Sequence, residues 1–88
     1  MQILSINQQA NNNPFQAVSQ KYLQRAEKEF ARRKGITGDL LDCIAYDVFF
    51  KQLSKQDAID TLNAIKPYVT GAKDFYEHIY QIITKLSQ

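Results

Sequence analysis

Three side chains that commonly bind divalent metals lie close together near the carboxyl end of the chain. Asp74 and His78 are four residues apart, and Glu77 lies between them. That spacing brings a carboxylate and an imidazole to one face of a helix, where they could share a metal ion. A stable site needs further ligands, however, and the sequence offers no second pair at a matching spacing. We therefore expect no metal site and interpret this cluster as the solvated side of a helix.

Two further acids are spaced for proton transfer. Asp39 and Asp42 lie one helical turn apart, and Tyr46 follows a turn later. Two carboxylates in such an arrangement can exchange protons with a bound substrate. They also stabilise the amino end of a helix, because carboxylates interact favourably with the positive end of its dipole. We favour the second interpretation, since it accounts for both acids and needs no substrate.

Cys43 is the only cysteine of the sequence, so an intramolecular disulfide is excluded and a cysteine-based metal site would lack its other ligands. A nucleophilic thiol needs a nearby base, and the only histidine, His78, belongs to a different predicted helix. The three glycines punctuate helices and form no phosphate-binding loop. We therefore predict no catalytic residue, no metal and no cofactor, and expect that the protein is not an enzyme.

The most pronounced charge pattern is the stretch KYLQRAEKEFARRKG, residues 21–35, which carries six of the chain's 11 Lys and Arg residues. Four of the six recur at helical intervals and share a face about 60° wide on a helical wheel. The other two add charge where that helix is expected to end. We call this set the basic stripe: Lys21, Arg25, Lys28, Arg32, Arg33 and Lys34.

The basic stripe has three interpretations. Its charges can be a solvated helix face, a docking surface for an acidic protein partner, or a surface for nucleic acid, whose phosphates four cations rising over about 16 Å could follow. We favour the solvated face, because a net charge of +2 is modest for a nucleic-acid-binding protein. No exposed aromatic residues are predicted among these cations, so stacking on bases lacks support. The acids that could balance the basic stripe within the fold are Glu27, Glu29, Asp39, Asp42 and Asp47.

The chain that must position these residues has 88 residues, of which 44% are hydrophobic and 23% charged, as is typical of one globular domain with a small core. Its first residues, MQILSINQQ, lack the basic and apolar regions of a secretory signal. No apolar run approaches the roughly 18 residues of a membrane span. With its single cysteine, the chain is therefore expected to be cytoplasmic and to have no membrane partner.

Apolar residues that return every third or fourth position predict an all-α fold. Because the predicted connections are short, the helices are expected to pack as antiparallel neighbours in a compact four-helix bundle. Residues 1–13 are rich in amides and poor in bulky apolar groups, so they are predicted to form a flexible polar arm ahead of a single helical domain, 14–88. The predicted helices span about 14–34, 39–53, 55–69 and 72–87.

Several residues predict where these helices begin and end. Asn13 followed by Pro14 is typical of a helix start, and Gly35 is well placed as the left-handed residue after a helix end. Thr37 or Asp39 is expected to cap the second helix. The third helix opens with a variant of the capping box, in which Ser54 is followed by Asp57.

The second and third predicted helices each leave an alternative open. The second is apolar on nearly every side, which predicts a central helix, although its run IAYDVFF also has the propensity of a buried strand. In the third, Pro67 removes a backbone hydrogen bond and crowds the preceding turn. The third helix is therefore expected either to kink at Pro67 or to stop near Lys66, with one short turn following.

Tyr76 and Tyr80 lie at the margin of the apolar face of the fourth helix and are candidate protein-interface residues. We predict a small helical protein–protein interaction module, with an adaptor or regulatory role and a protein partner. A homodimer through the fourth helix or the surplus apolar face of the second is one form of this prediction. The alternative is a nucleic-acid-binding accessory protein that uses the basic stripe on DNA or RNA. A helix-turn-helix over 53–80 is disfavoured, because Asp74 and Glu77 would repel phosphate.

Overall fold

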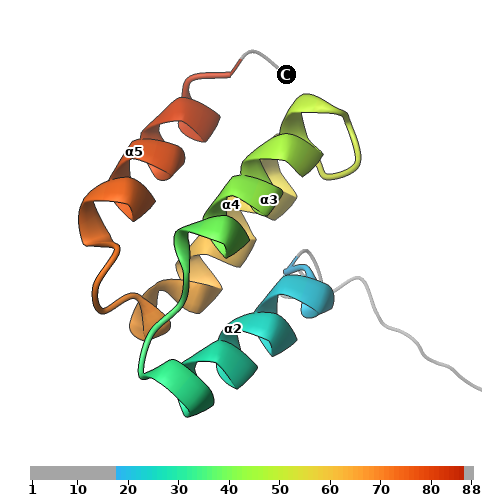
Figure 1. Cartoon of the computed structure of the whole chain (residues 1–88). Helices are drawn as coiled ribbons and strands as arrows, with labels where there is room; N and C mark the ends of the chain where they lie inside the picture. Colours follow the sequence, from blue (N-terminus) through green and yellow to red (C-terminus); the bar gives the residue numbers. More distant parts are fainter. Residues whose placement is uncertain (1–17, 87–88) are drawn as a thin grey trace, which may run out of the picture.

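A computed structural model describes residues 18–86 of the chain. The predicted flexible arm over 1–13 and the predicted helix start at Asn13 and Pro14 lie outside the described residues. Helices and no strands are found over 18–86, which confirms the all-α four-helix bundle and shows that the strand alternative for IAYDVFF is wrong. The α-helices are α2 (Gln20–Arg33), α3 (Gly38–Phe49), α4 (Lys55–Ile65) and α5 (Lys73–Thr84), and a short 3₁₀ helix, η3 (Lys66–Tyr68), follows α4 (Figure 1).

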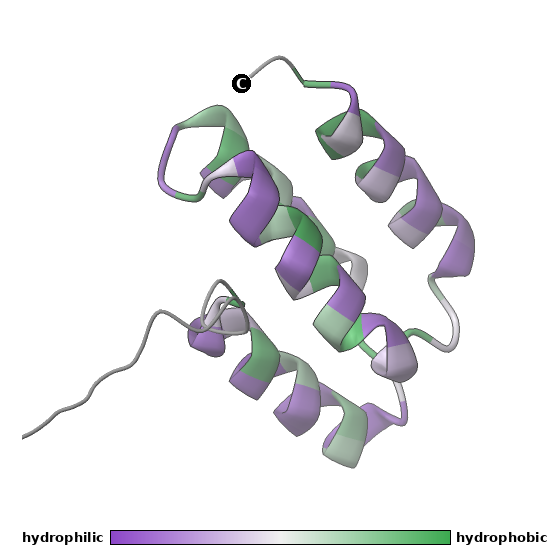
Figure 2. Cartoon of the chain, turned by 180° about the vertical axis from the view of Figure 1, so that it is seen from behind, coloured by the Kyte–Doolittle hydropathy of each residue, from purple (hydrophilic) through white to green (hydrophobic). Residues whose placement is uncertain are grey.

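Helices α3 and α4 form the middle of the bundle, and α2 and α5 flank them (Figure 1). Helix α3 contacts α2, α4 and α5, as expected for a helix that is apolar on most sides. Hydrophilic residues lie along the outward side of α5, and hydrophobic residues face its neighbours (Figure 2). Each large apolar side chain that becomes fully buried stabilises the fold by roughly 1.5–3 kcal/mol. The fully buried ones are Leu40, Leu41, Ile44, Val48, Leu62, Ile65 and Ile83.

Helix α2 begins later than its sequence predicts. Val18 and Ser19 are not helical, and Ser19 is the extended N-cap residue. The backbone N–H of Ser19 donates to Oγ1 of Thr61 in α4, at 2.8 Å. This tertiary hydrogen bond holds the chain extended at a point where apolar periodicity alone continues the helix. The prediction of one continuous helix over 14–34 is therefore wrong at Val18 and Ser19, and the helix that precedes Gly35 begins at Gln20.

The end of α2 differs from the prediction at Gly35. Lys34 is the left-handed residue, with φ of 65°, and its N–H donates to the carbonyl of Phe30 at 2.8 Å. No glycine among residues 18–86 has a positive φ. The loop around Gly35 also meets the segment after η3: the Thr70 hydroxyl donates to the carbonyl of Lys34 at 2.8 Å, and Ile36 N–H to that of Tyr68 at 3.3 Å. We call these two contacts the loop brace.

Helix α3 ends at Phe49, four residues before the predicted end at residue 53. Lys51 is left-handed, with φ of 62°, and reverses the chain. The N–H groups of Gln52 and Leu53 then donate back to the carbonyl of Asp47, at 2.7 and 3.2 Å. These hydrogen bonds satisfy a carbonyl that helix termination would leave unpaired. Helix α4 begins at Lys55, two residues after Leu53.

The predicted features of the third helix are confirmed. Oγ of Ser54 accepts a hydrogen bond from the backbone N–H of Asp57 at 3.0 Å. Helix α4 stops at Ile65, and Pro67 lies in η3, so the chain breaks into a short turn rather than kinking. Helix α5 ends at Thr84, earlier than predicted; 87–88 lie outside the description. No helix within 18–86 has the length and hydropathy to cross a lipid bilayer.

Candidate functional site

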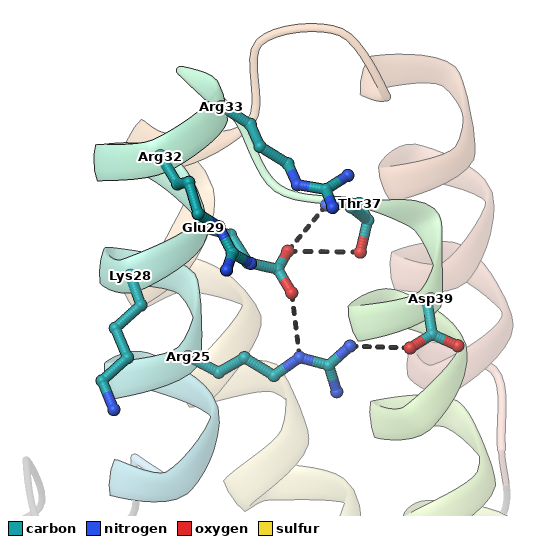
Figure 3. A pocket seen from close by; sticks show the side chains of 7 residues that line it. All are labelled: Arg25, Lys28, Glu29, Arg32, Arg33, Thr37 and Asp39. Atoms are coloured by element: carbon teal, nitrogen blue, oxygen red, sulfur yellow. Dashed lines mark hydrogen bonds and ion pairs between the residues drawn. The ribbon is translucent and has the colours of Figure 1, made fainter.

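The basic stripe of α2 lies against α3, and Arg25 is its most constrained member. The Arg25 guanidinium donates from Nε to Glu29 at 2.9 Å and from Nη2 to Asp39 at 2.7 Å (Figure 3). Its Nη1 lies 3.7 Å from Sγ of Cys43. Arg25 thus joins two helices and two carboxylates, so the internal charge balance predicted for the basic stripe is present at this residue.

Glu29 is buried, with 7% of its surface exposed. One carboxylate oxygen accepts from the backbone N–H of Thr37 at 2.9 Å and from its hydroxyl at 3.2 Å, and the other accepts from Arg25. Burial acts to raise the pKa of Glu29, but these hydrogen bonds outweigh it and hold the pKa below its ordinary value. Thr37 is the N-cap residue of α3, as predicted, but its side chain makes no capping hydrogen bond.

Lys21 and Tyr22 both reach Asp47 of α3. The Lys21 ammonium lies 3.5 Å from Oδ2 of Asp47, and the Tyr22 hydroxyl donates to the same oxygen. Burial, followed by the hydrogen bond and the negative charge of Asp47, raises the pKa of Tyr22. Lys21 at the start of α2 and Arg25 in its middle are therefore engaged with acids of the same fold.

The remaining cations of α2 surround a hollow of about 500 Å³ between the end of α2 and the start of α3. Lys28, Arg32 and Arg33 are exposed and form no ion pair within the described part of the chain. Lys34 is exposed beside them and likewise has no ion-pair partner among residues 18–86. We call this space the cationic hollow; its lining is Arg25, Lys28, Glu29, Arg32, Arg33, Thr37 and Asp39 (Figure 3).

Three large aromatic side chains are exposed at the carboxyl end of α3. Tyr46 is 59% exposed, Phe49 47% and Phe50 68%, and the rings of Tyr46 and Phe50 stack with centroids 6.3 Å apart. We call them the aromatic trio. The surplus apolar face predicted for the second helix is present, and these three residues form its exposed part. The sequence indicated such an exposed surface, because α3 carries apolar residues on more sides than its neighbours can cover.

Of the two tyrosines proposed as interface residues, Tyr76 lies in the core and Tyr80 is half-buried against it. The Tyr76 hydroxyl donates to the carbonyl of Leu62 at 2.6 Å. Burial, with smaller contributions from Tyr80 and Glu77, raises the pKa of Tyr76 to about 12. Tyr76 therefore holds α5 to α4 and offers no surface to a partner in this fold.

The other chemically suggestive residues do not assemble into a reactive site. Within residues 18–86, no three His, Cys, Asp or Glu side chains gather as metal ligands, and Asp74, Glu77 and His78 are exposed on α5. Asp39 is held by Arg25, and Asp42 is exposed. Cys43 is half-buried between α2 and α3.

Comparison with known proteins identifies no relative: the chain matches no family model, no curated protein and no solved structure. The face formed by α2 and α3 is therefore interpreted from its own chemistry.

Proposed function

We propose that the protein is a non-catalytic docking module, adaptor or regulatory in role, that binds a protein partner through the aromatic trio. The observation that carries the proposal is the exposure of Tyr46, Phe49 and Phe50 at 59%, 47% and 68%. Aromatic residues dominate the energetically important centres of protein interfaces. Contiguous apolar patches exposed to water often mark such interfaces. The single cysteine, Cys43, supports a cytoplasmic setting.

The aromatic trio by itself is too small for a stable interface, whether the partner is a different chain or a second copy of this one. At about 200 Å² for a whole aromatic side chain, the trio exposes roughly 350 Å². A symmetric dimer through the trio alone would bury about 700 Å² in total, short of the roughly 1,200 Å² of a stable interface. The trio therefore suits the apolar centre of a larger contact, whose rim the neighbouring side chains of α2 and α3 supply.

Nucleic acid is the second candidate ligand, and the unpaired cations Lys28, Arg32 and Arg33 favour it. The exposed acid Asp42 on the adjoining helix acts against it, because a carboxylate repels phosphate. Titration of labelled duplex DNA, single-stranded DNA and RNA at increasing salt tests this candidate. Binding that falls steeply with salt, and that Lys28→Gln with Arg32→Gln abolishes, would establish it; absence of binding at low salt would remove it.

A photo-crosslinking amino acid at position 50 tests the docking proposal in the native host. The same substitution at Gln81, exposed on α5, is the matched control. We expect a protein crosslinked from position 50 and not from position 81. That protein, once purified, is titrated against wild-type protein, the Phe50→Ser variant and the Gln81→Ser variant.

Loss of one large interface aromatic should weaken the complex by on the order of tenfold or more, and Gln81→Ser should leave the affinity unchanged. Two results would overturn the proposal: identical crosslinks from positions 50 and 81, or equal affinities for the wild type and Phe50→Ser. Light scattering of the free protein separates self-association from docking of another chain. A dimer that Phe50→Ser dissolves would make a second copy the partner.

A further inference from the structure

We infer that the docked partner segment is acidic, with carboxylates in the cationic hollow and an apolar side chain on the aromatic trio. The inference rests on the proposed function and adds the chemistry of the partner. Neither surface alone specifies it: the aromatic trio selects apolar groups of any chain, and the cationic hollow selects anions of any kind. The partner class follows from the presence of both on one face of the bundle.

The cationic hollow carries more positive than negative charge. Its lining contains four cations and two carboxylates, which leaves two positive charges in excess. Both carboxylates are occupied: Glu29 accepts three hydrogen bonds, and Asp39 accepts from Arg25. Arg25 binds both carboxylates but offsets only one of their two charges, so Lys28, Arg32 and Arg33 supply the excess of two positive charges over the remaining one. In Figure 3 the Arg32 side chain lies beside Glu29, the Arg33 side chain extends toward Thr37, and the Lys28 side chain points away from both.

The register between α2 and α3 places the cationic hollow and the aromatic trio on one face. Lys21 meets Asp47, and Arg25 meets Asp39, so the two helices run antiparallel with the basic stripe beside the exposed face of α3. The cationic hollow thus lies at the start of α3 and the aromatic trio at its end. Asp39 and Tyr46 are seven residues apart, about 10 Å along the helix, and Phe50 lies a turn further on. Two to three turns of a partner helix would cover both.

The two surfaces together favour carboxylates of a polypeptide over phosphates as the bound anion. Carboxylates on a polypeptide come with apolar side chains at helical spacing, which the aromatic trio can take up. Phosphates of nucleic acid would meet the exposed carboxylate of Asp42 between the cationic hollow and the aromatic trio. A partner helix can place an uncharged or basic residue there, whereas a phosphate backbone carries its charge at every step. The charge distribution therefore favours an acidic amphipathic segment.

Three synthetic amphipathic peptides of about 18 residues, roughly five helical turns, test the inference. All carry the same Leu and Phe positions on one face and differ only in their polar positions, which are Glu, Gln or Lys. Binding is measured by fluorescence anisotropy, at low and high salt, to wild-type full-length protein. The same titrations are made with a hollow variant, Lys28→Gln with Arg32→Gln and Arg33→Gln. The matched control removes three charges elsewhere: Lys66→Gln, Lys73→Gln and Lys85→Gln.

We expect the Glu peptide to bind wild type about tenfold more tightly than the Gln peptide at low salt, since several exposed ion pairs of modest strength add up to that ratio. The preference should fall to within about twofold in the hollow variant and at high salt, and it should persist in the charge-matched control. The Lys peptide should bind most weakly.

The outcomes separate the inference from the proposed function. Equal binding of the Glu and Gln peptides, with both lost in the double variant Tyr46→Ser with Phe50→Ser, overturns the inference and supports docking at the aromatic trio. Glu-peptide binding that this double variant leaves unchanged contradicts both. Binding of RNA or DNA that the hollow variant abolishes, and with which the Glu peptide does not compete, assigns the cations to nucleic acid and also overturns the inference.

Discussion

A Cβ atom on Gly35 would lie 2.2 Å from Oγ1 of Thr70. The glycine is therefore required by a close approach between two connections, and not by a left-handed backbone, which Lys34 supplies instead. The same Thr70 hydroxyl donates to the carbonyl of Lys34, so the atom that leaves no room for a Cβ at position 35 is also held in place by a hydrogen bond.

Gly35→Ala should destabilise the fold, because Thr70 must rotate away and give up its hydrogen bond or the backbone must shift. The expected loss in the free energy of unfolding is about 1–2 kcal/mol. In a Thr70→Ala background the same substitution should cost less, since Oγ1 is gone. Urea denaturation of the two single variants and the double variant measures this coupling. Additive effects would show that the contact does not constrain residue 35.

Glu29 should make the stability of the fold sensitive to acid. Its pKa is lower in the folded than in the unfolded chain, whose ordinary value is 4.5. The contribution is therefore present in full above that value and is lost as the pH falls through the folded pKa. The urea midpoint of the wild type should drop below pH 4.5 more steeply than that of Glu29→Gln. Parallel curves for the two proteins would contradict this assignment.

Tyr22 and Tyr76 should resist ionisation at alkaline pH while the chain stays folded. Burial raises the pKa of both, to about 12 for Tyr76, from an ordinary 10.0. Because the folded pKa is the higher one, their stabilisation is complete below pH 10 and is lost as the pH rises toward the folded values. Phenolate absorbance should show two of the five tyrosines titrating late, and Tyr76→Phe should leave one. A single titration step for all five tyrosines of the folded chain would contradict the burial of Tyr22 and Tyr76.

Substitution of Phe50 should leave the stability of the fold nearly unchanged, whereas substitution of Ile44 should lower it strongly, although both are large apolar residues of the same segment. Phe50 is 68% exposed and Ile44 fully buried. Phe50→Ser should change the free energy of unfolding by less than about 0.5 kcal/mol, as surface substitutions usually do. Ile44→Ala should cost about 2–5 kcal/mol. Thermal unfolding of both variants gives the comparison, and a large loss in Phe50→Ser would place its ring in the core.

The architecture was predictable because the spacing of apolar residues indicates directly which side of a helix is buried. The capping role of Ser54 and the break at Pro67 were also predictable, since both depend on neighbours in sequence. The helix ends at Gln20 and Phe49 were not. They are set by the Ser19–Thr61 hydrogen bond and by the reversal at Lys51, which local spacing does not encode.

The face formed by the cationic hollow and the aromatic trio could be predicted only in part from the sequence. The cations of the basic stripe were identified, but not which of them remain without an ion-pair partner, because that depends on Asp39 and Asp47 arriving from another helix. A surplus apolar face was predicted for the second helix, but not that Phe49 and Phe50 form it, because periodicity identifies apolar residues without counting the helices available to cover them. The burial of Glu29 depends on an N–H of Thr37, a backbone group that carries no residue signature.

The loop brace couples the first and third connections of the bundle, since Lys34 and Ile36 are hydrogen-bonded to Thr70 and Tyr68. In the turn after α3 the backbone N–H groups donate to carbonyls of that helix, those of Tyr46, Asp47 and Val48, and the Leu53 side chain packs against the core. For protein engineering, the connections are therefore not interchangeable. A label or grafted epitope in either braced connection would have to be accommodated by both, whereas the exposed Lys51 and Gln52 can be replaced without disturbing another connection.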